Sequence, residues 1–463
     1  MNKLSLTAIL FLLPVYLWAQ TCDCLAQFSF VKGHYEKNNP AFQKIKNDTK
    51  AYRQYAAEVQ ALDKPIRKET SSERCIVWLE KYVALLKDHH SGININLKRL
   101  QLDFNSPSVI DSFRKTDAYR SFKIIKVDST ELYSQLASKS SSDIEGIYTN
   151  GGSITFGVVQ NKKNHYSAIV LKKSKLLDVG HILMELETTK SPSVFKSIYN
   201  IGLSGFNFQK IYKTVEVKNG KMAEYGFYKP GIQPEEEQGV FSFKEIDTQT
   251  NYLKLTSFTY PLKDKLNAFY KTIDSTITSK PYLIIDLRNN GGGSEECYFN
   301  LLPYVYTQPF KIDDVELWVS PENIKQYENF QNKNIELISR MKSATPFSFI
   351  PQVENGASEW KMESTTNPKK VAILFNRYTA SSAESMITYC IQSSKVVTLG
   401  ENSGGYLGYG NVMTTVTPCG NLSLNSTTTK YKNNSRYEFI GIKPMVKLNA
   451  QSNWIEAARK ALQ

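Results

Sequence analysis

Three groups of residues in this sequence have the chemistry for covalent catalysis: a serine, a run of glycines and a histidine pair. Ser381 lies between the apolar segment 371–375 and an amphipathic segment that begins at Ser382. A serine at a strand-to-helix turn is exposed, and the helix N-terminus favours a developing negative charge. Ser381 is therefore a candidate nucleophile, although Ser381-Ser382-Ala383-Glu384 also has the pattern of a capping box, in which the serine only satisfies helix amides.

The glycine run Gly291-Gly292-Gly293 directly follows the apolar segment Tyr282–Leu287. Glycines leave backbone amides free and allow a substrate to approach the chain closely. Such amides could donate to an oxyanion, which contributes roughly 3 kcal/mol to transition-state stabilisation. A phosphate-binding loop would need a following Gly-Lys-Ser/Thr or a dinucleotide spacing, and neither is present. A plain turn is the remaining alternative.

A general base that acts near neutral pH is most easily a histidine, whose reference pKa is about 6.5. The chain has five histidines, and two of them, His89 and His90, stand side by side. They follow a segment with apolar residues on one helical face and precede the alternating Ile93/Ile95/Leu97 segment. The pair is therefore predicted to lie at a helix-to-strand junction.

The elements that must position these groups divide the chain into three parts after an N-terminal leader. Residues 21–110 have helical periodicity and carry the histidine pair, and residues 111–235 contain short strand-like runs separated by polar turns. Residues 236–463 alternate buried-type strands with helices, which is typical of an α/β core. We therefore expect a multidomain α/β protein with an N-terminal helical unit and a middle antiparallel β unit.

The first residues indicate export. Lys3 is followed by the apolar run Leu4–Trp18 and by Ala19-Gln20, which together have the form of a short signal peptide over residues 1–20. We expect a periplasmic or extracellular protein without an integral membrane segment after this signal is removed. Its six cysteines permit disulfides, and the first pair expected joins Cys24 or Cys22 to Cys75.

Two segments together are more specific than either alone: Ile284-Ile285-Asp286-Leu287-Arg288-Asn289-Asn290-Gly291-Gly292-Gly293, and further on Thr379-Ala380-Ser381-Ser382-Ala383-Glu384. The combination resembles the C-terminal processing, or tail-specific, serine peptidase family over roughly residues 240 to 460. It is most similar to the tricorn-like branch, because Leu86-Lys87-Asp88-His89-His90-Ser91 resembles the element that supplies the catalytic histidine there. The resemblance implies a core of the ClpP/crotonase type.

The resemblance also implies roles for single residues: Ser381 as nucleophile, His90 as general base, Glu438 as the acid that orients the histidine, and Gly292 or Gly293 together with Ser382 as the oxyanion hole. Tyr406 stands about where the Ser/Lys branch has its lysine, so the histidine arrangement is preferred. Because His89 replaces a small residue, the sequence leaves open which of the two rings is the base.

The function expected is hydrolysis of peptide bonds in a peptide or protein substrate through an acyl-enzyme, with no metal or cofactor. Activity should fall below roughly pH 6, because the base must be neutral. Two alternatives remain: an inactive family member that binds a peptide or an apolar ligand, and an esterase. The net charge of +13 comes from lysines spread along the whole chain, so nucleic acid is not an expected partner. The oligomeric state is left open.

Overall fold

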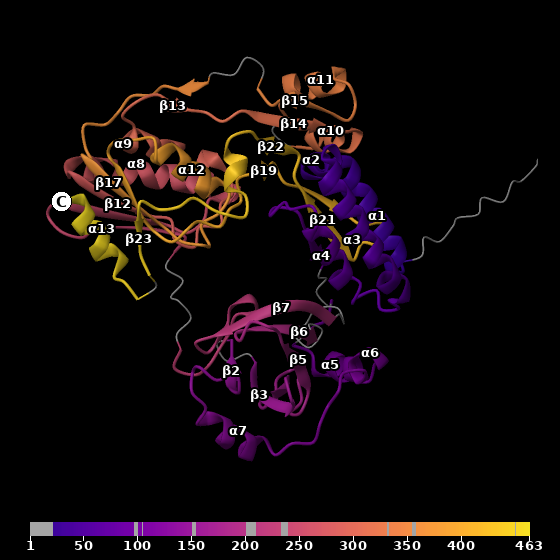
Figure 1. The fold of residues 1–463 in the computed structure, drawn as a ribbon. Coiled ribbons are helices and arrows are strands. Elements are labelled where there is room, and N and C mark those ends of the chain that lie inside the picture. Colours follow the sequence, from indigo (N-terminus) through magenta and orange to yellow (C-terminus); the bar gives the residue numbers. More distant parts are fainter. Residues whose placement is uncertain are drawn as a thin grey trace, which may run out of the picture.

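The computed structural model describes residues 22–96, 101–103, 105–150, 154–200, 210–232, 239–330, 333–353, 358–449 and 451–463. The predicted signal peptide, residues 1–20, lies outside these residues. No helix in the described part is long and apolar enough to cross a membrane. The chain forms an α/β protein of several parts, in which a helical region, a β-barrel and a large α/β region can be distinguished (Figure 1).

Three of the four N-terminal helices, α1 to α3, begin at a side-chain cap, and α4 does not. The four helices are α1 (Cys24–Asn38), α2 (Pro40–Asn47), α3 (Thr49–Lys68) and α4 (Ile76–Ala84). Asp23, Asn39 and Asp48 accept hydrogen bonds from the first amides of α1, α2 and α3. The disulfide Cys24–Cys75 joins the start of α1 to the residue before α4, which is one of the two pairings expected from the sequence.

Strand β1 (Gly92–Ile95) ties this helical region to the far end of the chain. It pairs antiparallel with β21 (Leu422–Ser426), which in turn pairs with β20 (Met413–Val416). A second disulfide, Cys22–Cys419, spans 397 residues of sequence. The histidine pair therefore enters the structure on a loop that is anchored to the C-terminal part.

The middle of the chain forms a closed antiparallel barrel, preceded by three short helices: α5 (Pro107–Arg114), α6 (Asp117–Arg120) and α7 (Ser129–Ala137). Its strands are β2 (Gly146–Thr149), β3 (Thr155–Lys162), β4 (His165–Val170), β5 (Ile182–Thr188), β6 (Val194–Asn200), β7 (Lys210–Lys218), β8 (Lys221–Met222) and β9 (Phe227–Tyr228). Phe156, Leu183 and Val215 are buried in its apolar interior. Residues 122–127 make only an isolated bridge beside the barrel, from Ile124 to His181.

The α/β region is built on a six-stranded sheet in the order β10-β11-β12-β17-β18-β23. The strands are β10 (Phe241–Glu245), β11 (Thr250–Leu255), β12 (Tyr282–Asp286), β17 (Lys370–Phe375), β18 (Val396–Gly400) and β23 (Val446–Lys447). All neighbours are parallel except β10 and β11. The carboxyl ends of β12 and β17 therefore lie side by side, which brings the loops that follow them together.

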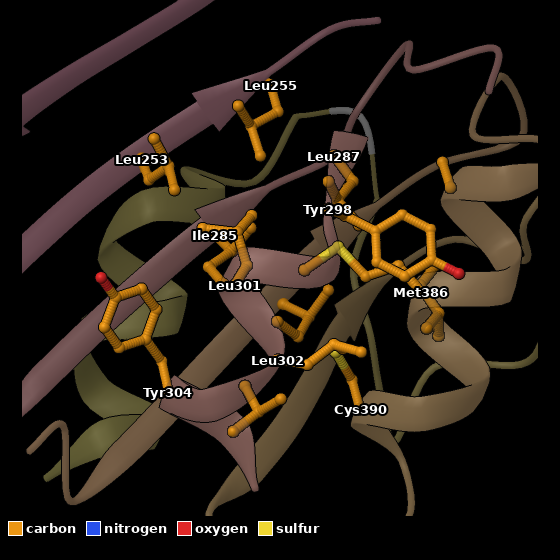
Figure 2. Packing of buried hydrophobic residues seen from close by; sticks show 14 of the residues in the cluster. Leu253, Leu255, Ile285, Leu287, Tyr298, Leu301, Leu302, Tyr304, Met386 and Cys390 are labelled. Atoms are coloured by element: carbon orange, nitrogen blue, oxygen red, sulfur yellow. The ribbon is translucent and has the colours of Figure 1, made fainter. Parts of the chain in front are cut away.

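Helices cover both faces of this sheet. Helices α8 (Lys263–Ser279), α9 (Leu302–Val305) and α12 (Ser382–Cys390) pack on one face, and α13 (Trp454–Leu462) packs on the other. Figure 2 shows the first interface, where Ile285 and Leu287 of the β12 segment meet Leu301, Met386 and Cys390. Because β12 and β17 are buried on both faces, their sequences are apolar without alternation.

A smaller sheet, in the order β15-β14-β22-β19, lies between the helical region and the six-stranded sheet. Residues 310–360, which we call the insertion, form β13 (Phe310–Lys311), β14 (Val315–Val319), α10 (Pro321–Glu328), α11 (Ile335–Ser343), β15 (Ser348–Pro351) and β16 (Glu359–Trp360). The other two strands of the smaller sheet, β19 (Tyr409–Gly410) and β22 (Thr429–Tyr431), come from later in the chain. Trp318 of β14 donates a 2.8 Å hydrogen bond to the Lys37 carbonyl of α1, so the insertion also packs on the helical region.

Candidate active site

Ser381 stands at the turn between β17 and α12, with φ 55° and ψ −125°. Positive φ is unfavourable for a serine and persists only where the surroundings impose it. Two hydrogen bonds fix the turn against the loop after β12. The Thr379 hydroxyl donates to the Leu287 carbonyl at 2.8 Å, and the Ala380 amide donates to the Asn290 carbonyl at 2.9 Å. The neighbouring carboxyl ends of β12 and β17 thus hold the serine in a strained, defined place.

Glu384 organises the loops around this serine. Its carboxylate accepts hydrogen bonds from the Ser381 amide (2.9 Å), the Ser403 hydroxyl (2.6 Å), the Gly405 amide (2.8 Å) and the Tyr406 amide (2.8 Å). Burial raises its pKa, while these four donors act in the opposite direction. The glutamate of the predicted capping box therefore does more than cap α12, since it also positions the loop 403–406.

The glycine loop approaches the serine through its backbone. A Cβ at Gly292, whose φ is 90°, would lie 2.6 Å from the Ala380 carbonyl oxygen and 2.7 Å from the Ser381 Cβ. A Cβ at Gly293, whose φ is 140°, would lie 2.1 Å from the Phe258 carbonyl oxygen. Both positions require glycine, because any side chain would push the loop away from the nucleophile.

The free amides beside Ser381 belong to Gly293 and Ser382. The Gly292 amide donates to the Asn290 side chain at 3.0 Å, so it is already engaged. Among the described residues, neither the Gly293 amide nor the amide of Ser382, the first residue of α12, has a hydrogen-bond acceptor. Gly293 and Ser382 also line the same groove as Ser381. Of the two glycines considered from the sequence, the geometry therefore favours Gly293 as the oxyanion donor.

His90 meets the serine directly. Its Nε2 lies 3.1 Å from the Ser381 Oγ, across 291 residues of sequence. Burial lowers the pKa of His90, an effect that Asp88 partly opposes and His89 reinforces. The imidazole is thus neutral at neutral pH and available to accept a proton. Its other nitrogen, Nδ1, is buried and has no hydrogen-bond partner in the described part of the chain.

Asp88 holds the loop that presents His90. This buried carboxylate accepts from the His90 amide (3.0 Å) and from the side chains of Asn39 (3.0 Å), Ser91 (2.7 Å) and Thr427 (2.7 Å). The donors come from the helical region, from the loop itself and from the C-terminal part. The sequence motif contained Asp88, but no role was inferred for it, because its partners are distant in sequence.

His89 faces away from the serine. Its Nδ1 lies 2.8 Å from the Gly405 carbonyl oxygen, and its ring lies against Tyr406 and Phe439, with centroid distances of 4.4 and 3.7 Å. Of the two rings left open by the sequence, the geometry therefore places His90 on the nucleophile. His89 instead packs the histidine loop onto the loops 403–406 and 437–441.

Glu438 lies close to the histidine pair but binds backbone. Its carboxylate accepts from the His89 amide at 2.9 Å and from the Gly408 amide at 2.6 Å. Burial raises its pKa to about 7, against the effect of these two donors. The structure therefore places Glu438 where it positions the loop of the base, and the acid that acts electrostatically on the His90 ring is Asp88.

A groove of about 1910 Å³ runs past these groups. Near the serine it is lined by His90, Gly293, Ser381 and Ser382, and further away by the insertion, including Phe330 and Val353. It is large enough for an extended peptide rather than a single small molecule. Among the described residues no group of three or more His, Cys, Asp and Glu side chains is arranged to hold a metal ion.

The arrangement can perform acyl transfer, since a serine, a neutral imidazole and two free amides converge on one point. Residues 249–448 match the family model "Peptidase family S41". This segment contains Gly292, Gly293, Ser381 and Glu438, and His90 lies outside it. No curated protein matches the sequence significantly.

Three solved structures of low sequence identity are similar to this chain. Mature CPAF matches with a TM-score of 0.50 and 14% identity, covering 95% of this chain and 96% of the other. The photosystem II D1 C-terminal processing protease matches with a TM-score of 0.39 and 14% identity, covering 96% and 98%. A peptidase from Parabacteroides merdae matches with a TM-score of 0.32 and 17% identity, covering 48% and 64%. The CPAF match shows a shared fold.

Proposed function

We propose that this chain, whose residues 249–448 match peptidase family S41, is an exported serine peptidase that cleaves peptide bonds through an acyl-enzyme formed on Ser381. The observation that carries the proposal is the 3.1 Å approach of His90 Nε2 to Ser381 Oγ. Export is supported by the charged and apolar start of the sequence and by two disulfides, which persist in oxidising compartments.

In the first step His90 accepts the proton of Ser381 as the hydroxyl oxygen attacks the scissile carbonyl carbon. The tetrahedral anion then lies against the amides of Gly293 and Ser382, at the N-terminus of α12, where the helix also favours negative charge. The protonated imidazole returns its proton to the leaving amine, which departs and leaves an ester on Ser381.

The second half-reaction mirrors the first. A water gives its proton to His90 and attacks the ester carbonyl, and the collapse of the second tetrahedral anion returns the proton to Ser381. Asp88 favours the protonated imidazole in both halves by its charge, whereas Glu438 holds the loop of the base through the His89 amide. We further propose that the six-stranded sheet with its helices is a core of the ClpP/crotonase type.

A fluorophosphonate probe tests the proposal on the mature protein, because it reacts only with an activated serine. We expect labelling of Ser381, identified by mass spectrometry of the labelled peptide, together with cleavage of an unfolded protein substrate. Ser381→Ala should abolish both. Ser394→Ala, which changes an exposed serine of the same region, serves as the matched control and should leave both intact.

Each contrary outcome points to one alternative. Labelling without peptide cleavage, but with hydrolysis of small acyl esters, would assign an esterase. Absence of labelling and of cleavage, with retained peptide binding, would assign a binding protein that has kept the fold.

A further inference from the structure

A second carboxylate stands beside the nucleophile without a role in the steps above. Glu295 belongs to the short 3₁₀ turn Glu295–Cys297, two residues after Gly293. It lines the groove that contains Ser381, and so does Ser385, which lies one helical turn after the nucleophile on α12. Glu295 is therefore within reach of the substrate residue whose carbonyl or amide meets the nucleophile.

Three of the other four carboxylates that line the groove pair with a lysine and Asp313 accepts from backbone amides, whereas Glu295 has neither kind of partner among the described residues. Glu296 pairs with Lys263 at 3.2 Å, Asp313 accepts from the amides of Asn433 and Asn434, Asp314 pairs with Lys432 at 3.1 Å, and Glu316 pairs with Lys430 at 2.8 Å. Among the described residues Glu295 makes no ion pair. Glu295 is only partly exposed, and a carboxylate that is partly withdrawn from water without a cation is costly, so it calls for a functional reason.

The surroundings of Glu295 are hydroxyl groups rather than charges. The hydroxyls of Ser385 and Tyr298 favour its ionised form, while burial acts more strongly and raises its pKa. Tyr389 and Tyr431 line the same groove, and the negative charge of Glu295 contributes to their raised pKa values, which burial mainly causes. The Tyr298 hydroxyl is fully buried and completes no hydrogen bond within the described residues. This end of the groove thus offers one carboxylate among neutral polar groups.

We propose that Glu295, with the hydroxyls around it, forms a subsite for the positively charged side chain of a lysine or arginine next to the scissile bond. The cation supplies the counter-charge that the protein does not, and the neutral hydroxyls accept its remaining N–H donors. Binding energy gained there is retained in the transition state and raises kcat/KM for basic substrates. This inference rests on the proposed peptidase function and adds the class of substrate to it.

The test compares matched substrates on the mature enzyme. Peptides that differ only in arginine against citrulline, and in lysine against norleucine, are placed at each position flanking a mapped cleavage site, and kcat/KM is measured. We expect the charged residue to be preferred by about 10- to 100-fold at one position, the range of a hydrogen-bonded charge. Glu295→Gln should reduce that preference to less than about 3-fold, whereas Glu296→Gln, the neighbouring carboxylate, should leave it unchanged.

The outcomes separate this inference from the proposed function. Cleavage without a preference for the charged residue at any position overturns the subsite, and so does a preference that Glu295→Gln leaves intact. Absence of cleavage by the wild-type protein overturns the peptidase proposal and the subsite with it. The comparison of arginine with citrulline on the wild-type enzyme needs no variant, so it decides the matter even if Glu295→Gln fails to fold.

Discussion

Ser381 is held in place mainly by backbone geometry of the α/β region, whereas the loop of His90 is held by polar side chains that converge on the buried Asp88. The serine depends on the adjacent ends of β12 and β17, on a positive φ and on a glycine loop with no room for a side chain. The histidine loop depends on Asp88 and on the donors that converge on it. A mutation should therefore disable Ser381 by changing the backbone of the glycine loop, and His90 by removing a side-chain hydrogen bond to its loop.

This difference has a physical reason. Parallel strands place their carboxyl ends within one another's reach without help, so the nucleophile needs only a tight turn. The base arrives on a loop between a helix and the strand β1, where nothing regular fixes the backbone. Such a loop needs side-chain hydrogen bonds to a buried carboxylate to keep one conformation. The second mode of support uses residues that are scattered along the sequence.

The largest effect should come from removing the base. His90→Ala is expected to lower kcat/KM by about 10²- to 10⁴-fold, the usual contribution of a general base. The protein should remain folded, since the ring contacts little besides the active site. His89→Ala, measured in parallel, should cost far less, because that ring contacts the Gly405 carbonyl and the rings of Tyr406 and Phe439 rather than the nucleophile. Equal losses in the two variants would contradict the assignment of His90.

Activity should be lost when the backbone around Ser381 is displaced. Gly292→Ala is expected to lower kcat by about 10²- to 10³-fold, the cost of losing an oxyanion donor, because the new methyl group displaces the loop from Ser381 and Ser382. Gly291→Ala is the matched control, since a Cβ there meets no atom within 4 Å. If both variants keep the wild-type kcat, the close approach of the glycine loop to Ser381 is not needed for catalysis.

On the side of the base, activity should be lost when a side chain that holds the loop of His90 is removed. Asp88→Asn is expected to lower kcat by about 10- to 100-fold, with a small change in KM, because the loop of His90 loses its fixed position. We also expect a loss of about 1–3 kcal/mol in the free energy of unfolding, measured by urea titration. Asp63→Asn, at an exposed helix pair with Arg67, provides the surface control. Unchanged kcat in Asp88→Asn would show that the loop is held by other means.

The smallest effect concerns pH. The imidazole must be neutral to accept a proton, and burial lowers the pKa of His90. The kcat/KM of the wild-type enzyme should therefore stay level down to about pH 6.5, the ordinary value for histidine, and fall only at more acidic pH. Asp88 raises this pKa, so Asp88→Asn should move the fall to still lower pH. Glu438 has a pKa of about 7, and a fall that disappears in Glu438→Gln would assign the titration to that residue instead.

The regular elements around the site were predictable because their signals are local. The apolar segments Tyr282–Leu287 and Val371–Phe375 became β12 and β17, and the helix expected from Ser382 became α12. After Ser294 the chain forms the short 3₁₀ turns Glu295–Cys297 and Phe299–Leu301 and the four-residue helix α9 rather than one continuous helix. There the Ser294 amide donates to the Phe258 carbonyl, a contact between distant segments that no local pattern reveals.

The residues that hold the loop of His90 could not be predicted either, because they also come from distant segments. Asp88 was visible as part of a motif, but its partners Asn39 and Thr427 lie far away in sequence on both sides. The sequence predicted that either Cys24 or Cys22 forms a disulfide with Cys75. The structure pairs Cys24 with Cys75, and it pairs Cys22 with Cys419, which the sequence did not indicate. Neither contact leaves a periodic trace, because each is set by the way the N-terminal region docks on the C-terminal part.

The hydrogen bond from Thr427 to Asp88 also makes the support of the base depend on the far end of the chain. The two residues are 339 positions apart, and a chain emerges from the ribosome with its N-terminus first. The loop of His90 therefore gains this support only after almost the whole polypeptide has been made.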